Sequence, residues 1–298
     1  MDDKVYIILL NYNNYEDTIN CVQSIEKNEL GLNYKIVVVD NCSTDDSALK
    51  LEKIKNIVFI ASKENGGFAK GNNIGIEYAM KDGADYILLL NNDTVIEKQA
   101  ISKMINKIKG HKDIGILGSR TMYYDNPTLI NYNGGHINWL KAITVHEGYK
   151  EEFKNEGQDF KYTDFITGCC MLIKREVIEK VGMLPEEYFM YYEDVDYCMK
   201  TIEAGYKLGV SMDTIIYHKV SSSSGGENSP FSIKWGNRNR LIFINKYKKY
   251  TKGILTTFVY YITRFILVFK YILKHDMKRK QAIIDGIKEG RKYLKGNR

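Results

Sequence analysis

Short carboxylate and amide side chains follow two apolar runs of this sequence, at points where they could bind a charged ligand. Asp40 follows the run Ile36–Val39, and Asn91 and Asp93 follow the run Tyr86–Leu90. A carboxylate there can accept hydrogen bonds from a nucleobase or ribose, or it can bind a divalent ion that holds a diphosphate. The structural alternatives are a capped turn at Asp40 and an Asx turn at Asp93.

A segment rich in glycine and asparagine lies between these two positions. It begins as Asn65-Gly66-Gly67-Phe68 and continues through Asn72 into a stretch with helical periodicity. Glycine lets the backbone approach a ligand closely, and free amides at the start of a helix suit an anion. The segment matches neither the P-loop nor the dinucleotide-binding spacing, so by itself it is a weak indication of a nucleotide site.

Three acidic residues, Glu193, Asp194 and Asp196, come directly after an aromatic stretch. Packing beside apolar rings raises the pKa of a carboxyl group, which makes one of the three a candidate general base. Neighbouring side chains on a helix are about 100° apart, so the three cannot all point into one site. For Asp196 we favour the structural alternative, in which an acidic residue stabilises the N-terminal end of a helix.

Apolar runs of strand length would position these side chains. Four such runs, each followed by a stretch with helical periodicity, lie at Val5–Leu10, Ile36–Val39, Ile57–Ile60 and Tyr86–Leu90. This alternation predicts an α/β sandwich with a largely parallel sheet. The ligand crevice of such a sheet lies beyond the carboxyl ends of its strands.

The pattern weakens between about 121 and 163, where we expect irregular loops and short strands. The expected elements after it are an ordered stretch at Phe165–Arg175, a helix from near Glu193, a strand around Ile215–His218, a loop at Ser221–Gly226 and helices beyond Pro230. A lone histidine is ordinarily structural, but the strand-end position of His218 favours a ligand role.

Composition narrows the class of protein. The 298 residues are 44% hydrophobic and 27% charged, which suits one large domain and an appendage. The net charge of +6 forms no basic stripe, so we expect no nucleic-acid partner. The five cysteines are odd in number and lack zinc-site or disulfide spacings, and the first apolar run begins too early for a secretory signal. We therefore expect a cytoplasmic protein with reduced thiols.

These elements, in this order, resemble the family 2 glycosyltransferases with a GT-A fold, particularly the rhamnosyltransferase-like branch that builds bacterial and archaeal surface polysaccharides. The resemblance covers roughly Val5 to Arg240. It rests on five motifs, which are Asn11-Tyr12-Asn13, the stretch Val39–Asp45, the stretch Asn65–Ala69, Asn91-Asn92-Asp93 and Glu193-Asp194.

The resemblance implies a role for each matched residue. The nucleotide of the donor would contact Asn11, Asn13, Asp40, Asn65, Gly66, Gly67, Asn72 and Asn91, with Asp40 at the base. Asp93 would bind Mg²⁺ or Mn²⁺, His218 would assist the metal, and Arg238 would meet the diphosphate. Asp194 would be the catalytic base, with Glu193 beside it. Asn91 stands where many relatives have aspartate, which leaves the metal site one carboxylate poorer.

The implied reaction is the inverting transfer of a sugar from dTDP-rhamnose or a UDP-hexose to a hydroxyl of a glycan or lipid-linked acceptor, in the synthesis of surface polysaccharide. The implied domains are a catalytic one at 1–230, with a nucleotide-sugar half at about 1–110 and an acceptor half at about 111–230, and a helical segment at 231–298. One alternative is a non-catalytic nucleotide-sugar-binding protein. Another is a sugar nucleotidyltransferase, although its glycine-rich, basic loop after the first strand is missing.

The segment Ile254–Leu273 is long and apolar enough to span a bilayer, but Arg264 and Lys270 argue against a span. At about 100° per residue its polar side chains share one arc, which leaves phenylalanine, isoleucine and leucine on the remainder. The polar arc comprises Thr256, Thr257, Thr263, Arg264, Lys270 and Lys274.

Basic residues flank this amphipathic segment, at 246–249 on one side and at Lys278-Arg279-Lys280 on the other. Such a helix suits an interface with anionic lipid, so we expect a peripheral protein at the inner face of the cell membrane. The alternative is that the apolar face packs on the catalytic domain or on a second subunit of a homo-oligomer.

Overall fold

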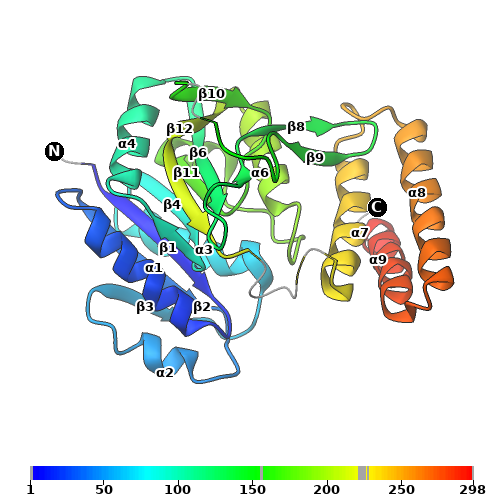
Figure 1. Cartoon of the computed structure of the whole chain (residues 1–298), viewed down its shortest axis with the longest axis horizontal. Helices are drawn as coiled ribbons and strands as arrows, with labels where there is room; N and C mark the ends of the chain where they lie inside the picture. The colour runs from blue at the N-terminus through cyan, green and yellow to red at the C-terminus, as the bar shows by residue number, and fades with distance from the viewer. Residues whose placement is uncertain (1–2, 155–156, 221–225, 227, 297–298) are drawn as a thin grey trace. The chain divides into compact units, whose positions relative to one another are not determined.

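The computed structural model describes residues 3–154, 157–220, 226 and 228–296, and these form two compact units (Figure 1). The sheet unit comprises the described residues up to His136, together with His146–Phe189 and Glu193–Val220. The helical unit comprises Ile137–Val145, Met190–Tyr192 and the described residues from 226 onward.

Among the described residues, one ten-stranded sheet forms the centre of the sheet unit, in the order β10-β12-β6-β11-β4-β1-β2-β3, with β5 paired to β12 and β7 to β6. Its strands are β1 (Val5–Asn11), β2 (Tyr34–Asp40), β3 (Ile57–Ala61), β4 (Tyr86–Asn91), β5 (Thr94–Ile96), β6 (Ile114–Tyr123), β7 (Ile130–Tyr132), β10 (Phe160–Thr163), β11 (Cys170–Lys174) and β12 (Lys207–His218). A separate pair consists of β8 (Gly135–Asn138) and β9 (Ile143–His146).

The four predicted apolar runs are β1 to β4, and they are parallel, as expected. The register pairs Asn11 with Asp40, and Leu10 with Asn91, so the polar residues at the strand ends share one edge of the sheet. β11 runs antiparallel to both of its neighbours, whereas β6 and β12 are parallel to each other. The predicted α/β sandwich with a mostly parallel sheet is confirmed.

Helices cover both faces of this sheet. α1 (Tyr15–Asn28), α2 (Ser47–Leu51) and α4 (Ala100–Gly110) share one apolar core with alternate residues of β1, β2 and β4. On the opposite face lies α3 (Gly67–Lys81), whose Gly71 contacts Leu10 and whose Gly75 contacts Ile8. A Cβ added to Gly71 would collide with Leu10, and one added to Gly75 would collide with Ile8. These two glycines therefore serve close packing of the helix on the sheet. α5 (Arg175–Val181) and α6 (Glu193–Glu203) complete the unit, and α6 begins where predicted.

The structure adds two elements that the sequence pattern did not indicate, while the short strands β7 to β10 agree with the expectation for 121–163. The short strand β5, rather than a helix, follows β4, because the chain turns at 92–93 to pair with β12. The ordered strand β6 extends to Tyr123, into the region expected to be irregular. Gly115 and Gly118 interrupt its apolar pattern, but both face close neighbours, and a Cβ on Gly118 would lie 2.8 Å from Ile166 Cγ2.

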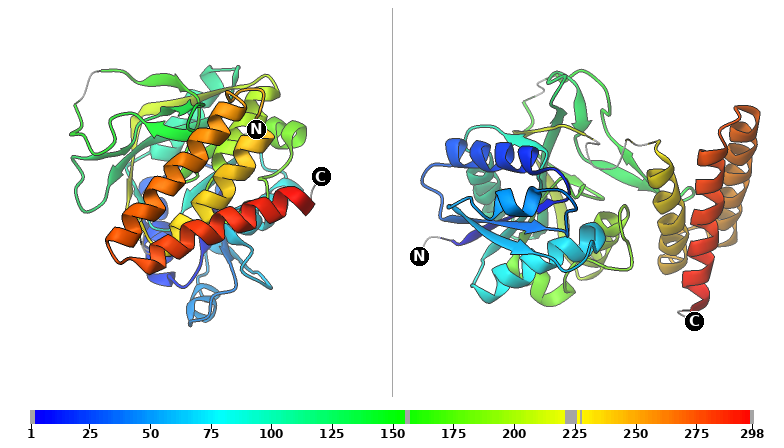
Figure 2. Two further views of the ribbon diagram at one scale, coloured as in Figure 1. Left: turned by 90° about the vertical axis from the view of Figure 1, so that its right-hand side faces the viewer. Right: turned by 90° about the horizontal axis from the view of Figure 1, so that it is seen from below.

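The helical unit contains α7 (Pro230–Lys246), α8 (Ile254–Leu273) and α9 (Met277–Gly296), which lie side by side (Figure 2). The expectation of helices beyond Pro230 is confirmed. The loop predicted at 221–226 falls outside the described residues, apart from Gly226.

α8 directs polar side chains toward its neighbours in the helical unit. Tyr260 donates to the carbonyl oxygen of Asn237 at 2.9 Å, and Arg264 donates to the Asn237 side chain at 2.9 Å. Thr256 donates to the carbonyl oxygen of Trp139 at 3.2 Å. Large apolar residues point outward instead, and Phe265 is 68% exposed. By length and composition alone, α8 would suffice to cross a membrane.

Candidate active site

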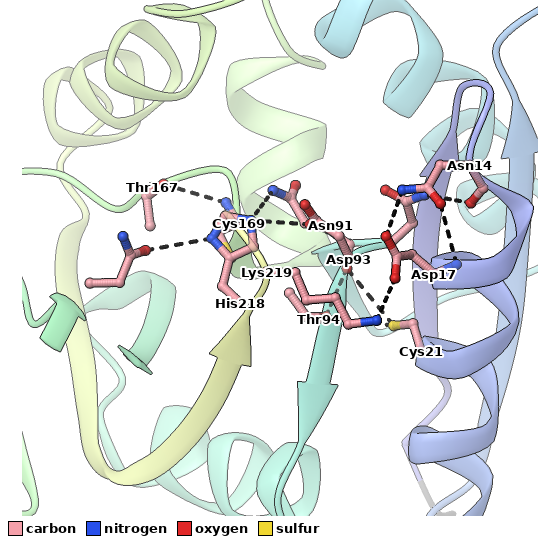
Figure 3. Close-up of polar contacts among 12 residues, drawn as sticks. Asn14, Asp17, Cys21, Asn91, Asp93, Thr94, Thr167, Cys169, His218 and Lys219 are labelled. Atoms are coloured by element: carbon pink, nitrogen blue, oxygen red, sulfur yellow. Dashed lines mark hydrogen bonds and ion pairs between the residues drawn. The ribbon is translucent and has the colours of Figure 1, made fainter. Parts of the chain in front are cut away.

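An ion pair joins the ends of β4 and β12 (Figure 3). Oδ1 of Asp93 lies 3.1 Å from Nε2 of His218, and both side chains are largely buried. The amide nitrogen of Asn91 lies 3.3 Å from the same imidazole nitrogen. The pairing of β12 with β5, which sets His218 opposite Thr94, brings these residues together from distant parts of the sequence.

Two amides indicate the tautomer of His218. The side-chain oxygen of Asn131 lies 3.5 Å from Nδ1, and the Asn91 amide group faces Nε2. A proton on Nδ1 satisfies both contacts, because Asn131 can then accept and Asn91 can donate. In the ion pair with Asp93, Nε2 carries a proton and donates to Oδ1, and loss of that proton frees the Nε2 lone pair for a bound cation. Asn131, on β7, was not among the residues singled out from the sequence.

These two acceptor atoms suit one bound divalent cation. Metal bonds to aspartate oxygen and histidine nitrogen are about 2.0–2.2 Å long, so ligand atoms 3.1 Å apart can share an ion. Among the described residues, no group of three or more histidine, cysteine or acidic side chains is placed to hold a metal. Asp93 and His218 could serve as two of the ligands, and an imidazole beside a carboxylate favours Mn²⁺ over Mg²⁺.

The electrostatics of His218 agree with an affinity for positive charge. Burial by itself lowers the pKa of His218, but the adjacent Cys169 and Asp93 outweigh it and raise that pKa well above its usual value. Cys169 precedes β11, and its carbonyl oxygen accepts from the backbone N–H of Asn91 at 2.9 Å.

Asp40 organises the turn after β2. Its carboxylate accepts from the Asn11 amide at 2.7 Å, from the Ser43 backbone N–H at 2.9 Å and from the Ser43 hydroxyl at 2.6 Å. Only 2% of Asp40 is exposed. The capped turn that was one alternative is therefore present, and contact between Asp40 and a nucleobase stays a prediction.

Asn13 ties the loop after β1 to the same turn. Its side-chain oxygen accepts from the Thr44 backbone N–H at 2.7 Å, and its own N–H donates to the Ser43 hydroxyl at 2.9 Å. Its φ of 54° lies in the left-handed region, which asparagine tolerates better than most residues. The loops after β1 and β2 thus form one hydrogen-bonded surface.

Asn41 connects this surface to the asparagine-glycine loop, and the sequence had not singled it out. Its amide donates to the Asn65 side chain at 3.0 Å, and its oxygen accepts from the Gly66 N–H at 3.2 Å. Gly67 has a φ of 77°, and a Cβ there would collide with the carbonyl oxygen of Phe189. Only glycine therefore allows this loop to approach the segment that precedes α6.

Asn72 is buried, as Asn11 and Asp40 are. It is 2% exposed inside α3 and donates to the carbonyl oxygen of Phe68 at 2.9 Å. Its contact with a nucleotide stays a prediction.

The predicted Arg238 belongs to α7 in the helical unit, where it donates to the Asn239 side chain at 2.6 Å and lies over the rings of Trp235 and Tyr293.

The first turn of α6 separates its three acidic side chains into different environments. Asp194 is partly exposed and accepts from the Gly168 N–H at 3.0 Å and from the Val195 N–H at 2.8 Å. Asp196 is fully buried and accepts from the Tyr188 hydroxyl at 2.8 Å. This hydrogen bond gives Asp196 a structural role, and the helix-end stabilisation favoured from the sequence stays a prediction.

The two adjacent carboxyl groups lie in different electrostatic surroundings. Burial and the charge of Asp194 raise the pKa of Glu193 well above its usual value, and Glu193 Oε2 has no hydrogen-bond partner within the described part of the chain. Burial also raises the pKa of Asp194, although the N–H groups of Gly168 and Val195 partly offset it. Hydrogen bonds to the ionised form therefore favour the carboxylate at Asp194, whereas burial and the neighbouring charge favour the protonated form at Glu193.

Solved structures share this fold. GalNAc-T7, solved with UDP, GalNAc and Mn²⁺, superimposes on this chain with a TM-score of 0.63 at 14% identity. The match covers 81% of this chain and 47% of GalNAc-T7. The mannosyltransferase PcManGT from Pyrobaculum calidifontis, solved with GDP-Man and Mn²⁺, gives a TM-score of 0.60 at 12% identity over 96% of this chain and 74% of its own. The expected GT-A fold is confirmed.

Sequence relatives agree. The low-salt glycan biosynthesis hexosyltransferase Agl10 of Haloferax volcanii is 26% identical over 82% of this chain and 76% of its own length. The dTDP-rhamnosyl transferase RfbF of Shigella flexneri is 28% identical over 75% of this chain and 72% of its own. The family described as Glycosyl transferase family 2 matches residues 6–182, more than half of the sequence. This chain therefore belongs to glycosyl transferase family 2.

Proposed function

We propose that this glycosyltransferase moves a sugar, with inversion, from a nucleoside diphosphate sugar to an acceptor hydroxyl in the synthesis of a surface glycan. The observation that carries the proposal is the pair of acceptor atoms on Asp93 and His218, 3.1 Å apart at the strand ends. The names of the relatives from Haloferax volcanii and Shigella flexneri support a hexose or dTDP-rhamnose donor.

Donor binding would use the edge of the sheet where β1, β2 and β4 end. Asp93 and His218 would hold a divalent cation, which neutralises charge on the leaving diphosphate when it is bound. The turn ordered by Asp40 and the loop at Asn65–Gly67 would receive the nucleotide. An approach of Arg238 to the diphosphate stays part of the proposal.

Asp194 would accept the proton of the acceptor hydroxyl. The acceptor oxygen forms a bond to the anomeric carbon from the face opposite the diphosphate, and the bond from that carbon to the diphosphate oxygen breaks. The bonding electron pair leaves with the nucleoside diphosphate, and the proton resides on Asp194. Two backbone N–H groups fix the orientation of this carboxylate, and a positioned base of raised pKa is the more effective proton acceptor.

Nucleotide sugars should stabilise the chain against heat in the presence of MnCl₂. A ligand at about 100 times its Kd stabilises the folded state by about 2.7 kcal/mol, which shifts the melting temperature of a protein of this size by several degrees. The measurement is a thermal shift across dTDP-rhamnose, UDP-glucose, UDP-N-acetylglucosamine and GDP-mannose, with and without MnCl₂. A chain that no nucleotide sugar stabilises would contradict the proposal.

We further propose that α8 rests on an anionic membrane surface. An amphipathic helix in water buries its apolar side, but α8 turns Thr256, Tyr260 and Arg264 inward and leaves phenylalanine and isoleucine exposed. Lysines before and after α8 complement anionic headgroups. The strongly polar α9 packs against α8, which favours a helix in the interface plane over one that crosses the bilayer.

The intact chain should cosediment at low salt with vesicles that contain phosphatidylglycerol. Replacing Phe258, Phe265 and Phe269 with serine should abolish this binding, because the three rings supply exposed apolar area. Replacing Lys278 and Lys280 with glutamine should weaken it most at low ionic strength. If the intact chain stays in the supernatant, or if the serine substitutions only dissociate a dimer, α8 does not bind lipid.

A further inference from the structure

The three residues before α6 form a turn with an unusual backbone. Tyr191 and Tyr192 have φ values of 73° and 74°, in the left-handed region that bulky residues rarely adopt. Backbone strain of this kind persists only where surrounding contacts enforce it, and it gathers at functional sites. The turn belongs to the helical unit, whereas Glu193 and Asp194, which follow it in the chain, belong to the sheet unit.

Asn239 of α7 holds this turn. Its amide donates to the carbonyl oxygen of Met190 at 2.8 Å and to that of Tyr191 at 2.9 Å, and its side chain is fully buried. Both carbonyl oxygens thus accept from one amide nitrogen while Tyr191 and Tyr192 are in the left-handed region. Two tyrosine hydroxyls support the same conformation, since Tyr191 contacts the Ser232 hydroxyl at 2.8 Å and Tyr192 donates to the carbonyl oxygen of Ala142 at 2.9 Å.

The turn is continuous with elements of the active site at both of its ends. Phe189, just before it, accepts a hydrogen bond from the Phe68 N–H at the start of α3, at 2.8 Å. Asp194, just after it, is fixed by the Gly168 N–H. The backbone of 190–192 therefore leads directly in the chain into the first turn of α6.

We propose that Asn239 is a positioning residue for Asp194, acting through the strained turn 190–192. The proposal rests on the proposed role of Asp194 as the base. It gives the helical unit a part in turnover that is separate from binding lipid: α7 sets the backbone from which the base projects. A small displacement of a base can slow a reaction about 100-fold, so one hydrogen-bonding amide suffices for a large effect.

The chain offers a matched pair of variants. Asn239 and Asn237 both lie on α7, both accept from an arginine through the side-chain oxygen, and both donate to backbone carbonyl oxygens. Asn237 donates within α7, to Ile233, and not to the turn. Asn239→Asp and Asn237→Asp each keep shape and acceptor but lose the donor.

Asn239→Asp should lower kcat about 10- to 100-fold with little change in the KM for the donor, whereas Asn237→Asp should stay within about threefold of wild type. The assay uses the radiolabelled nucleotide sugar that stabilises the chain most, with detergent-extracted membrane lipids as acceptor. Release of the turn should hydrate Asp194, so its pKa should fall and the acid limb of kcat should move to lower pH. Glu193 and His146, titratable neighbours of Asp194, are unchanged in both variants.

Hydrogen exchange gives a readout that does not depend on turnover. Peptides covering 188–196 should exchange faster in Asn239→Asp than in Asn237→Asp. If Asn239→Asp does not fold, Asn239→Ser, which keeps a shorter donor, should show the same changes at smaller size. Equal kcat and equal exchange in the two aspartate variants would overturn the proposal while Asp194→Asn stays inactive. If Asp194→Asn itself retains turnover, the assignment of the base is wrong. The positioning role of Asn239 is then wrong as well.

Discussion

Replacing Asp194 with asparagine should reduce sugar transfer by roughly two to four orders of magnitude and leave nucleotide affinity nearly unchanged. Asparagine keeps the size of the side chain but cannot accept the acceptor proton. Its oxygen can still take one of the two backbone hydrogen bonds that Asp194 receives, so the first turn of α6 should persist. Initial rates with a saturating donor, together with calorimetric titration of the donor, measure the two quantities.

Glu193→Gln is the matched control, because glutamine resembles the protonated glutamic acid that burial favours at this position. It should cost much less activity. A carboxyl group whose pKa is raised by folding stabilises the folded state fully below its unfolded pKa, about 4.3, and loses that contribution as pH rises through the folded value. The variant should therefore melt higher than wild type at alkaline pH, and this gain should vanish near pH 4. If Glu193→Gln is the more damaging change, Glu193 is the base.

The wild-type rate should fall as pH drops through the pKa of Asp194, because only the ionised carboxylate accepts a proton. Burial raises this pKa, so the fall should begin at a higher pH than for a solvent-exposed aspartate, which titrates near 3.9. The midpoint of the acid limb checks the assignment. A non-catalytic nucleotide-sugar-binding protein would show no turnover at any pH.

Replacing Asp93 with alanine should abolish the metal-dependent part of donor binding. Changes beyond the ligands of a metal site commonly cost 10- to 100-fold in affinity, so removal of one of two protein ligands should cost at least about 100-fold. It also leaves His218 without the carboxylate that lies 3.1 Å from Nε2. Calorimetric titration of the donor with MnCl₂ and with EDTA separates the metal-dependent and metal-independent parts.

Asp125→Ala is a suitable control for this change, since Asp125 is an exposed carboxylate in the turn after β6. It should leave both parts of donor binding intact. The same metal-dependent affinity in Asp93→Ala and wild type would remove Asp93 from the donor site, and it would leave the role of Asp194 untouched.

Local pattern was enough to find the strands that build the site, because a buried parallel strand needs an uninterrupted apolar run. The runs that end before Asn11, Asp40 and Asn91 therefore marked one edge of the sheet correctly. β6 was not predicted as a strand, because Gly115, Gly118 and Arg120 interrupt its apolar run. Gly115 and Gly118 are required by close neighbours in the folded chain. A hydrophobic periodicity contains no information about such neighbours.

The glycines in and after the asparagine-glycine loop also show what composition cannot predict. Its composition indicated a close approach to a ligand, but Gly71 and Gly75 turn out to face Leu10 and Ile8 of β1. Gly67 does lie at the loop, where it meets the backbone of Phe189. A glycine marks a place where a side chain does not fit, and only the fold shows what occupies that space.

The sequence by itself determined the family, the sheet and the residues at its edge, since these depend on local periodicity and on motifs that can be read in chain order. The tertiary structure alone decided which of those residues meet. It paired Asp93 with His218, set Glu193 and Asp194 in different environments, turned the polar side of α8 inward and joined Asn239 to the turn before α6. Each of these contacts joins segments or faces that only packing brings together, and the free energy that selects them arises when the folded chain excludes water around them.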